Sequence, residues 1–109
     1  QMTRIGNNMF EGCASLKSVS IPQTVTQIGY YAFSGCTSLK IVVIPNSTTS
    51  VGEYCFARCT SLQRVAIKGR IEHIDNGMFE NCVSLTTVAF PKNVHTIKSS
   101  PYIILVYLF

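Results

Sequence analysis

Hydrophobic side chains recur along the chain at a constant step of 23 residues, and the polar positions between them follow the same step. The phenylalanine column of this pattern is Phe10, Phe33, Phe56 and Phe79. Self-similarity at one short period is typical of repeat proteins, in which each unit buries its apolar face only against a neighbouring unit. The pattern predicts a single domain over 1–109, with units at 5–27, 28–50, 51–73 and 74–96 and a degenerate turn at 97–109.

One half of each unit alternates between apolar and polar residues, as a strand does. In the first unit Val19 and Ile21 point inward and Ser18 and Ser20 point outward, and Pro22 ends the strand because proline has no N–H to donate. The other half places a phenylalanine and a cysteine three residues apart, on one side of a helical or 3₁₀ turn. We therefore expect an α/β repeat solenoid with four parallel strands and short helical or 3₁₀ returns.

The segment from Tyr31 to Gly52 contains A-F-x-x-C followed by S-L-x-x-V-x-I-P and V-G. This arrangement resembles the BspA-like class of leucine-rich repeats, and the resemblance covers about residues 5 to 97. It implies a curved solenoid with a parallel sheet on the concave face. It also implies a surface or secreted protein of a bacterium or mucosal protist parasite that adheres to host cells or matrix proteins. Four residues depart from the repeat consensus without breaking its register: Thr48, Lys68, Asp75 and Lys98.

The two ends of the chain differ in character. Gln1 to Arg4 contains no apolar core of a signal peptide, and the start in the middle of the pattern favours a fragment of a longer array. Tyr102 to Phe109 is apolar but much shorter than the about 20 residues of a membrane-spanning helix. In the repeat register Tyr102 falls in the phenylalanine column and Leu108 in the leucine column, which predicts a decayed fifth turn.

Four of the five cysteines occupy one column, Cys13, Cys36, Cys59 and Cys82, and should stack about 4.8 Å apart with parallel side chains. That geometry favours buried free thiols, with a disulfide or a metal site as the alternatives. His73 and His95 lie among polar columns and are expected to be exposed. Every candidate nucleophile belongs to a structural column, so we expect no enzyme, no metal and no cofactor.

The formal net charge of +4 comes from nine Lys and Arg residues scattered among five acids. Nucleic-acid binding requires clustered positive charge, so we expect no nucleic-acid partner. The triplet Asn46-Ser47-Thr48 follows a predicted strand, and its asparagine would be an exposed glycosylation acceptor in a secreted protein.

Repeat proteins commonly bind partners on the sheet face of the solenoid. We therefore expect a protein-binding module, from an adhesin that binds a host or matrix protein. Its outward side chains on the sheet are Ser18, Ser20, Ile41, Val43, Arg64, Ala66, Thr87 and Ala89. The alternative is an assembly module that forms a homo-oligomer through uncapped ends. Its contact residues would be Tyr102, Ile103, Ile104, Val106, Tyr107 and Phe109.

Overall fold

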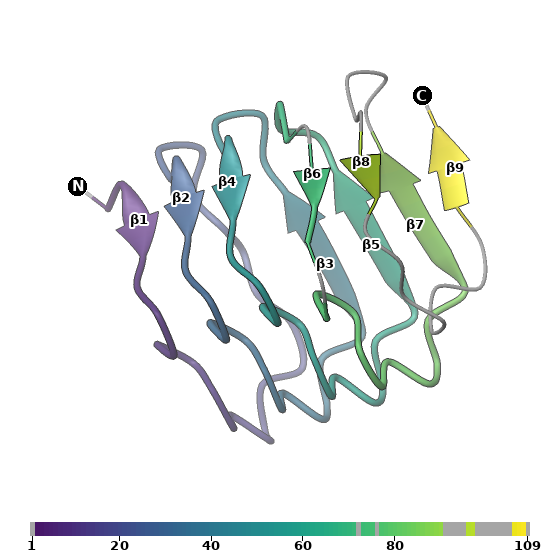
Figure 1. Cartoon of the computed structure of the whole chain (residues 1–109). Coiled ribbons are helices and arrows are strands. Elements are labelled where there is room, and N and C mark those ends of the chain that lie inside the picture. The colour runs from purple at the N-terminus through teal and green to yellow at the C-terminus, as the bar shows by residue number, and fades with distance from the viewer. Residues whose placement is uncertain (1, 72, 76, 91–95, 98–105, 109) are drawn as a thin grey trace.

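A computed structural model describes residues 2–71, 73–75, 77–90, 96–97 and 106–108, the last two stretches by their backbone alone. The chain winds as a series of turns stacked side by side, and the turns after the first each carry two short strands (Figure 1). The longer strands are β3 (Ile41–Ile44), β5 (Arg64–Ile67), β7 (Thr87–Phe90) and β9 (Val106–Leu108). The two-residue strands are β1 (Arg4–Ile5), β2 (Gln27–Ile28), β4 (Ser50–Val51), β6 (His73–Ile74) and β8 (Thr96–Ile97).

The longer strands form one parallel sheet in the order β3-β5-β7-β9. Val42 pairs with Val65, and Val65 with Val88, so neighbouring positions in the sheet are 23 residues apart in the sequence. Identical turns place such positions side by side, and the parallel solenoid sheet predicted from the repeat is confirmed. The first turn contributes only a single bridge, between Ser18 and Ile41, so its expected strand is absent from this sheet.

The fourth strand of the sheet is β9, which comes from the tail. Its register differs from the predicted one, because Val88 pairs with Val106 and Phe90 with Leu108, a step of 18 residues. Leu108 therefore stands in the column of Ile21, Ile44 and Ile67. The prediction that it continues the leucine column was wrong because the connection from β7 to β9 is shorter than a full repeat.

The return segments are successive turns, and no helix occurs in the part of the chain that the structure describes. Hydrogen bonds between residues three apart, as in a 3₁₀ helix, do form, such as the bond from the Cys13 N–H to the Phe10 carbonyl at 3.1 Å. They do not continue, because two columns in each return have positive φ, where a right-handed helix cannot pass. These residues are Asn8, Tyr31, Tyr54 and Gly77 in one column and Gly12, Gly35, Arg58 and Asn81 in the other.

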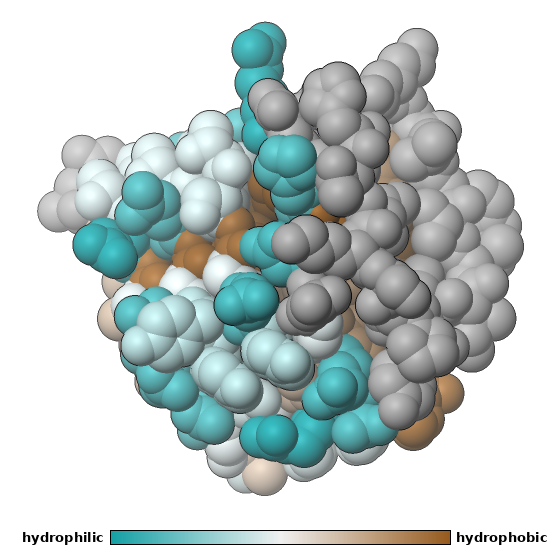
Figure 2. Space-filling view, viewed as in Figure 1, coloured by the Kyte–Doolittle hydropathy of each residue, from teal (hydrophilic) through white to brown (hydrophobic). Residues whose placement is uncertain are grey.

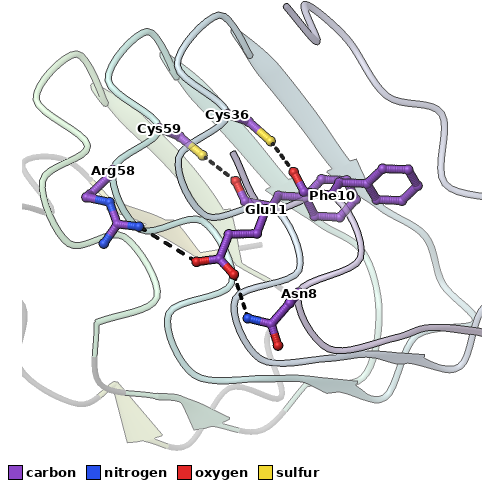
Figure 3. Close-up of polar contacts among 7 residues, drawn as sticks. Asn8, Phe10, Glu11, Cys36, Arg58 and Cys59 are labelled. Atoms are coloured by element: carbon purple, nitrogen blue, oxygen red, sulfur yellow. Dashed lines mark hydrogen bonds and ion pairs between the residues drawn. The ribbon is translucent and has the colours of Figure 1, made fainter. Parts of the chain in front are cut away.

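Side chains of these positive-φ columns make polar contacts within one turn, at Asn8, and between turns, at Arg58. The Asn8 amide donates a hydrogen bond to the Glu11 carboxylate at 2.6 Å, and the Arg58 guanidinium lies 3.9 Å from the same carboxylate (Figure 3). Both contacts are exposed to solvent, where an ion pair contributes roughly 0–1 kcal/mol. The returns are therefore held mainly by backbone bonds between turns, such as Phe10 N–H to the Ala32 carbonyl at 2.8 Å.

Phenylalanines stack through the centre of the array. The ring centroids of Phe10 and Phe33 are 5.3 Å apart, those of Phe33 and Phe56 are 5.5 Å apart, and those of Phe56 and Phe79 are 6.0 Å apart. The rings lie within 12° of parallel. Phe33, Phe56 and Phe79 are fully buried, whereas Phe10 in the first turn is half-buried. The column read from the sequence is thus the central row of the core.

The cysteine thiols are free, and Cys36, Cys55, Cys59 and Cys82 are buried. Three of them donate a hydrogen bond to the carbonyl of the phenylalanine 26 residues earlier. Cys36 donates to Phe10 at 3.3 Å and Cys59 donates to Phe33 at 3.1 Å (Figure 3), and Cys82 donates to Phe56 at 3.0 Å. Burial raises the pKa of Cys59 and of Cys82 to about 12, and it also raises the pKa of Cys36 and Cys55. The four thiols therefore act as small core side chains, and Cys36, Cys59 and Cys82 also donate to a backbone carbonyl of the preceding turn.

These environments predict slow thiol chemistry in the folded protein. At mildly alkaline pH, Cys13 should react readily with Ellman's reagent, while the four buried thiols should react only after unfolding, because the thiolate is the nucleophile. The folded-state pKa values of Cys59 and Cys82 are raised, so the stability that their neutral thiols contribute is complete below the ordinary thiol pKa. It is lost as the pH rises through that value towards about 12. Rapid reaction of all five thiols in the native state would contradict this account.

One buried column position carries a polar side chain. Thr48 stands where Val25 and Ile71 stand in other turns, and it is fully buried. Its hydroxyl donates a hydrogen bond to the Val25 carbonyl at 2.9 Å. A buried polar group costs little when it is paired, so the substitution is tolerated and the register continues, as the sequence predicted.

Candidate protein-binding surface

The outward side chains of the sheet form two rows. The first row contains Ile41, Arg64 and Thr87, which are cross-strand partners, and the bridge to β3 adds Ser18. The second row contains Val43, Ala66 and Ala89, which are also cross-strand partners. Ser20 is exposed but lies outside any strand. The structure therefore brings seven of the eight predicted residues together on one face, which we call the outer face of the sheet.

The outer face combines exposed apolar area with a positive charge. Ile41 is 49% exposed and Val43 is 42% exposed, although both lie on a regular strand whose other residues are buried. Arg64 is exposed beside Ile41. Among the described residues the only ion pair is the one between Arg58 and Glu11, so no described carboxylate neutralises Arg64. Such a surface suits a protein partner that has an apolar contact flanked by an acidic group.

The tail residues proposed for self-association are placed in part. Val106 and Tyr107 lie in β9, where they pair with Val88 and Ala89 of the same chain. Tyr102, Ile103, Ile104 and Phe109 lie outside the described residues. The tail therefore completes the sheet of its own chain through at least one strand.

The possible glycosylation site is exposed at its asparagine. Asn46 lies in the turn after β3, and its side chain is exposed. Ser47 and Thr48 both donate hydrogen bonds to the Val25 carbonyl, at 2.7 Å and 2.9 Å. In the folded chain the sequon is thus accessible at its acceptor residue and anchored at the two residues that follow.

A cavity between β4 and β6 was not predicted from the sequence. It has a volume of about 460 Å³ and is lined by Thr49, Ser50, Val51, Arg70, Ile71, His73 and Asp75. Figure 2 shows an apolar strip that crosses β1, β2 and β4 and ends where hydrophilic side chains over β6 begin. The available signal was Asp75, which stands in the column of Gly6, Gly29 and Gly52. His73 is exposed there, as expected, and His95 lies outside the described residues.

Within the residues that the structure describes, no three His, Cys, Asp or Glu side chains are grouped closely enough to hold a metal ion. A helix long and apolar enough to cross a membrane is also not found in the described part of the chain.

The chain is similar in structure to several bacterial leucine-rich repeat proteins. It aligns with such a protein from Bacteroides ovatus at 28% identity and a TM-score of 0.76, over 95% of this chain and 31% of that one. It aligns with the pneumococcal vaccine antigen PcpA at 20% identity and a TM-score of 0.72, over 93% of this chain and 24% of that one. It aligns with a leucine-rich cell surface protein from Faecalibacterium prausnitzii at 21% identity and a TM-score of 0.66, over 96% of this chain and 38% of that one.

The chain spans between about a quarter and two fifths of the length of these three proteins. No curated protein matches it in sequence. A family model described as the BspA type leucine rich repeat region matches residues 1–103 with six copies of its repeat. Together with the stacked parallel turns and the shared columns of phenylalanine, cysteine and leucine, this match shows that the chain belongs to the BspA-type leucine-rich repeat family.

Proposed function

We propose that this chain is a protein-binding module of a cell-surface adhesin and that it binds a host or matrix protein through the outer face of the sheet. The observation that carries the proposal is the exposed apolar pair Ile41 and Val43 on a regular strand, beside Arg64. Apolar side chains gathered on an exposed sheet face are typical of an interaction surface. The names of two structural neighbours, a vaccine antigen and a cell surface protein, support a surface location.

The sheet provides a rigid support for such a contact. Val42 and Ile44 alternate with the exposed pair and are fully buried, so β3 is anchored in the core along its length. Ala66 and Ala89 continue the second row with small side chains, which leave room for a partner's side chain beside Val43. Little conformational entropy is lost when a partner docks on a surface that is already ordered.

The experiment measures binding to a panel of purified extracellular-matrix proteins by surface plasmon resonance. We expect saturable binding to at least one of them. The double variant Ile41→Thr and Val43→Thr keeps β-branched residues in the strand but removes apolar area, so we expect it to weaken this binding about tenfold or more, a loss of roughly 1.4 kcal/mol. The matched control is Val83→Thr, which makes a comparable change at an exposed valine outside every strand.

A panel in which no protein binds, or binding that the double variant leaves intact, would contradict the proposal. The second candidate function is self-association through the apolar tail, Tyr102 to Phe109, which is the alternative that the sequence predicts. Light scattering on the same samples separates the two functions. Assembly requires a mass that rises above 12.0 kDa with concentration, whereas partner binding by the monomer does not.

A further inference from the structure

The short strands form a ladder that is interrupted between β4 and β6. From β1 to β4 the backbone repeats the same bond, with the Gly29 N–H donating to the Ile5 carbonyl and the Gly52 N–H donating to the Ile28 carbonyl, each at 2.8 Å. The next bond in this series would run from Asp75 to Val51, and it is not formed among the described residues. Instead, β1, β2 and β4 form one sheet, and β6 pairs with β8 in another.

The side chain of Asp75 is incompatible with the spacing that β2 and β4 adopt. A Cβ added at Gly52 would lie 2.6 Å from the carbonyl carbon of Gly29 and 2.6 Å from the Cα of Tyr30. A Cβ at Gly29 would be equally close to the backbone of Asn7. At the spacing of β1, β2 and β4, two turns can therefore pair at this column only when the later turn carries glycine. The restriction applies to that spacing, since β8 pairs with β6 although Lys98 stands in this column. Asp75 has a Cβ, so β6 cannot approach β4 as β4 approaches β2.

The separation leaves a cleft whose walls carry backbone groups of two strands. We define the β4–β6 cleft by the seven residues that line the 460 Å³ cavity, from Thr49 to Val51 on one side and Arg70, Ile71, His73 and Asp75 on the other. In β2 the Ile28 carbonyl points towards the following turn, where it accepts the Gly52 N–H. Val51 is the equivalent residue of β4 and is paired in the same register, so its carbonyl and N–H face the cleft.

Charged and polar side chains surround this backbone edge. Arg70 and His73 are exposed on the β6 side, and Thr49 and Ser50 present hydroxyl groups on the β4 side. Asp75 adds a carboxylate to the same lining, and no ion pair joins it to Arg70 or His73 among the described residues. Val51 and Ile71 add apolar area to the lining. A ligand for this cleft needs backbone-like donors and acceptors on one edge and an acceptor for cationic N–H groups.

We infer that the β4–β6 cleft binds an extended peptide segment that carries an acidic side chain. The peptide adds to the edge of β4 as a strand, with its main chain bonded to Val51 and its carboxylate facing Arg70 and His73. An extended backbone is what occupies the equivalent position beside β1 and β2 in the same molecule. The cavity volume lies in the range of sites that enclose a small ligand or a few residues of peptide.

Two substitutions at one position test this inference. Asp75→Gly restores the glycine of the column, so β6 should pair with β4 and close the cleft. Asp75→Ala removes the carboxylate but keeps the Cβ, so the cleft should stay open. Hydrogen exchange should then show increased protection of the amide at position 75 in the glycine variant and no such change in the alanine variant. Equal protection in the two variants would overturn the steric explanation of the cleft.

Binding is tested with short random peptides displayed on phage and selected in parallel on the wild type and on Asp75→Gly. We expect the wild type to enrich peptides that contain Asp or Glu. The most strongly enriched peptide, once synthesised, should bind the wild type, and it should bind Asp75→Ala at least as tightly because a repelling carboxylate is removed. Its affinity should fall at least tenfold on Asp75→Gly and several-fold on Arg70→Gln. The peptide should also slow exchange at the Val51 amide.

The inference would be overturned if no peptide is enriched more strongly on the wild type than on the glycine variant. It would also be overturned if free glutamate displaces the enriched peptide as well as the same peptide in solution does, because the site would then bind a small anion only. The variants lie outside the outer face of the sheet, so this result and the result for Ile41 and Val43 can fail separately.

Discussion

Replacing Phe56 with alanine is expected to lower the free energy of unfolding by about 3–5 kcal/mol, the range measured for buried aromatic residues truncated to alanine. Phe56 is almost completely buried and stacks on both faces, against Phe33 at 5.5 Å and Phe79 at 6.0 Å. The substitution removes both stacks and leaves a cavity that the neighbouring turns cannot fill, because each is tied to the next by backbone hydrogen bonds. Urea unfolding followed by circular dichroism measures the loss.

The matched control for Phe56 is Phe10, which occupies the same column in the first turn. Phe10 is half-buried and stacks only on Phe33, so Phe10→Ala should cost clearly less than Phe56→Ala. If Phe56→Ala does not fold at all, Phe56→Leu retains much of the volume and measures a smaller loss in the same direction. Equal losses at the two positions would show that the stack through the centre of the array does not stabilise the fold.

The repeat pattern predicted the sheet and the core because stacking identical turns is a local rule. Position i contacts position i+23, so a column that is apolar in every unit must face the same interior. The alternation of Ile41 to Ile44 likewise predicted which side chains of the outer face are exposed. The tail does not follow this rule because the connection from β7 to β9 is shorter than a repeat unit. The 23-residue period therefore assigned Leu108 to the wrong column.

The form of the returns could not be read from apolar spacing. A phenylalanine and a cysteine three residues apart fit a helical turn, but they also fit the two tight turns that the structure contains. The distinction depends on positive φ at two columns. Gly12, Gly35 and Asn81 were a signal for one column, and Asn8 and Gly77 were a signal for the other. Tyr31 and Tyr54 in the second column gave no signal, since tyrosine rarely adopts this conformation.

The β4–β6 cleft shows how a departure from the repeat can preserve register and still change the structure. Asp75 was recognised as a replacement of glycine, and the register does continue, since His73 pairs with Thr96. What changes is the pairing of neighbouring turns, since β6 pairs with β8 but not with β4. Sequence columns record which residues face each other, but they do not record how closely the backbones approach.

The same reasoning predicts a large effect at Gly52. Gly52→Ala places a Cβ 2.6 Å from backbone atoms of Gly29 and Tyr30, so β4 must move away from β2. The hydrogen bond from the N–H of residue 52 to the Ile28 carbonyl is then lost. We expect a loss of about 3 kcal/mol in the free energy of unfolding, as for overpacked sites that force the backbone to shift. Denaturant unfolding measures it, and hydrogen exchange at position 52 should accelerate.

Gly6→Ala provides the matched control, because Gly6 belongs to the same column but has no described turn on its outer side. A Cβ there would meet only the terminal carbon of Met9, at an ordinary 3.5 Å. We expect Gly6→Ala to change the free energy of unfolding by no more than about 0.5 kcal/mol. A comparable loss at both glycines would mean that the column requires glycine for its conformation. A loss confined to Gly52 would mean that the column requires glycine because the preceding turn lies too close for a side chain.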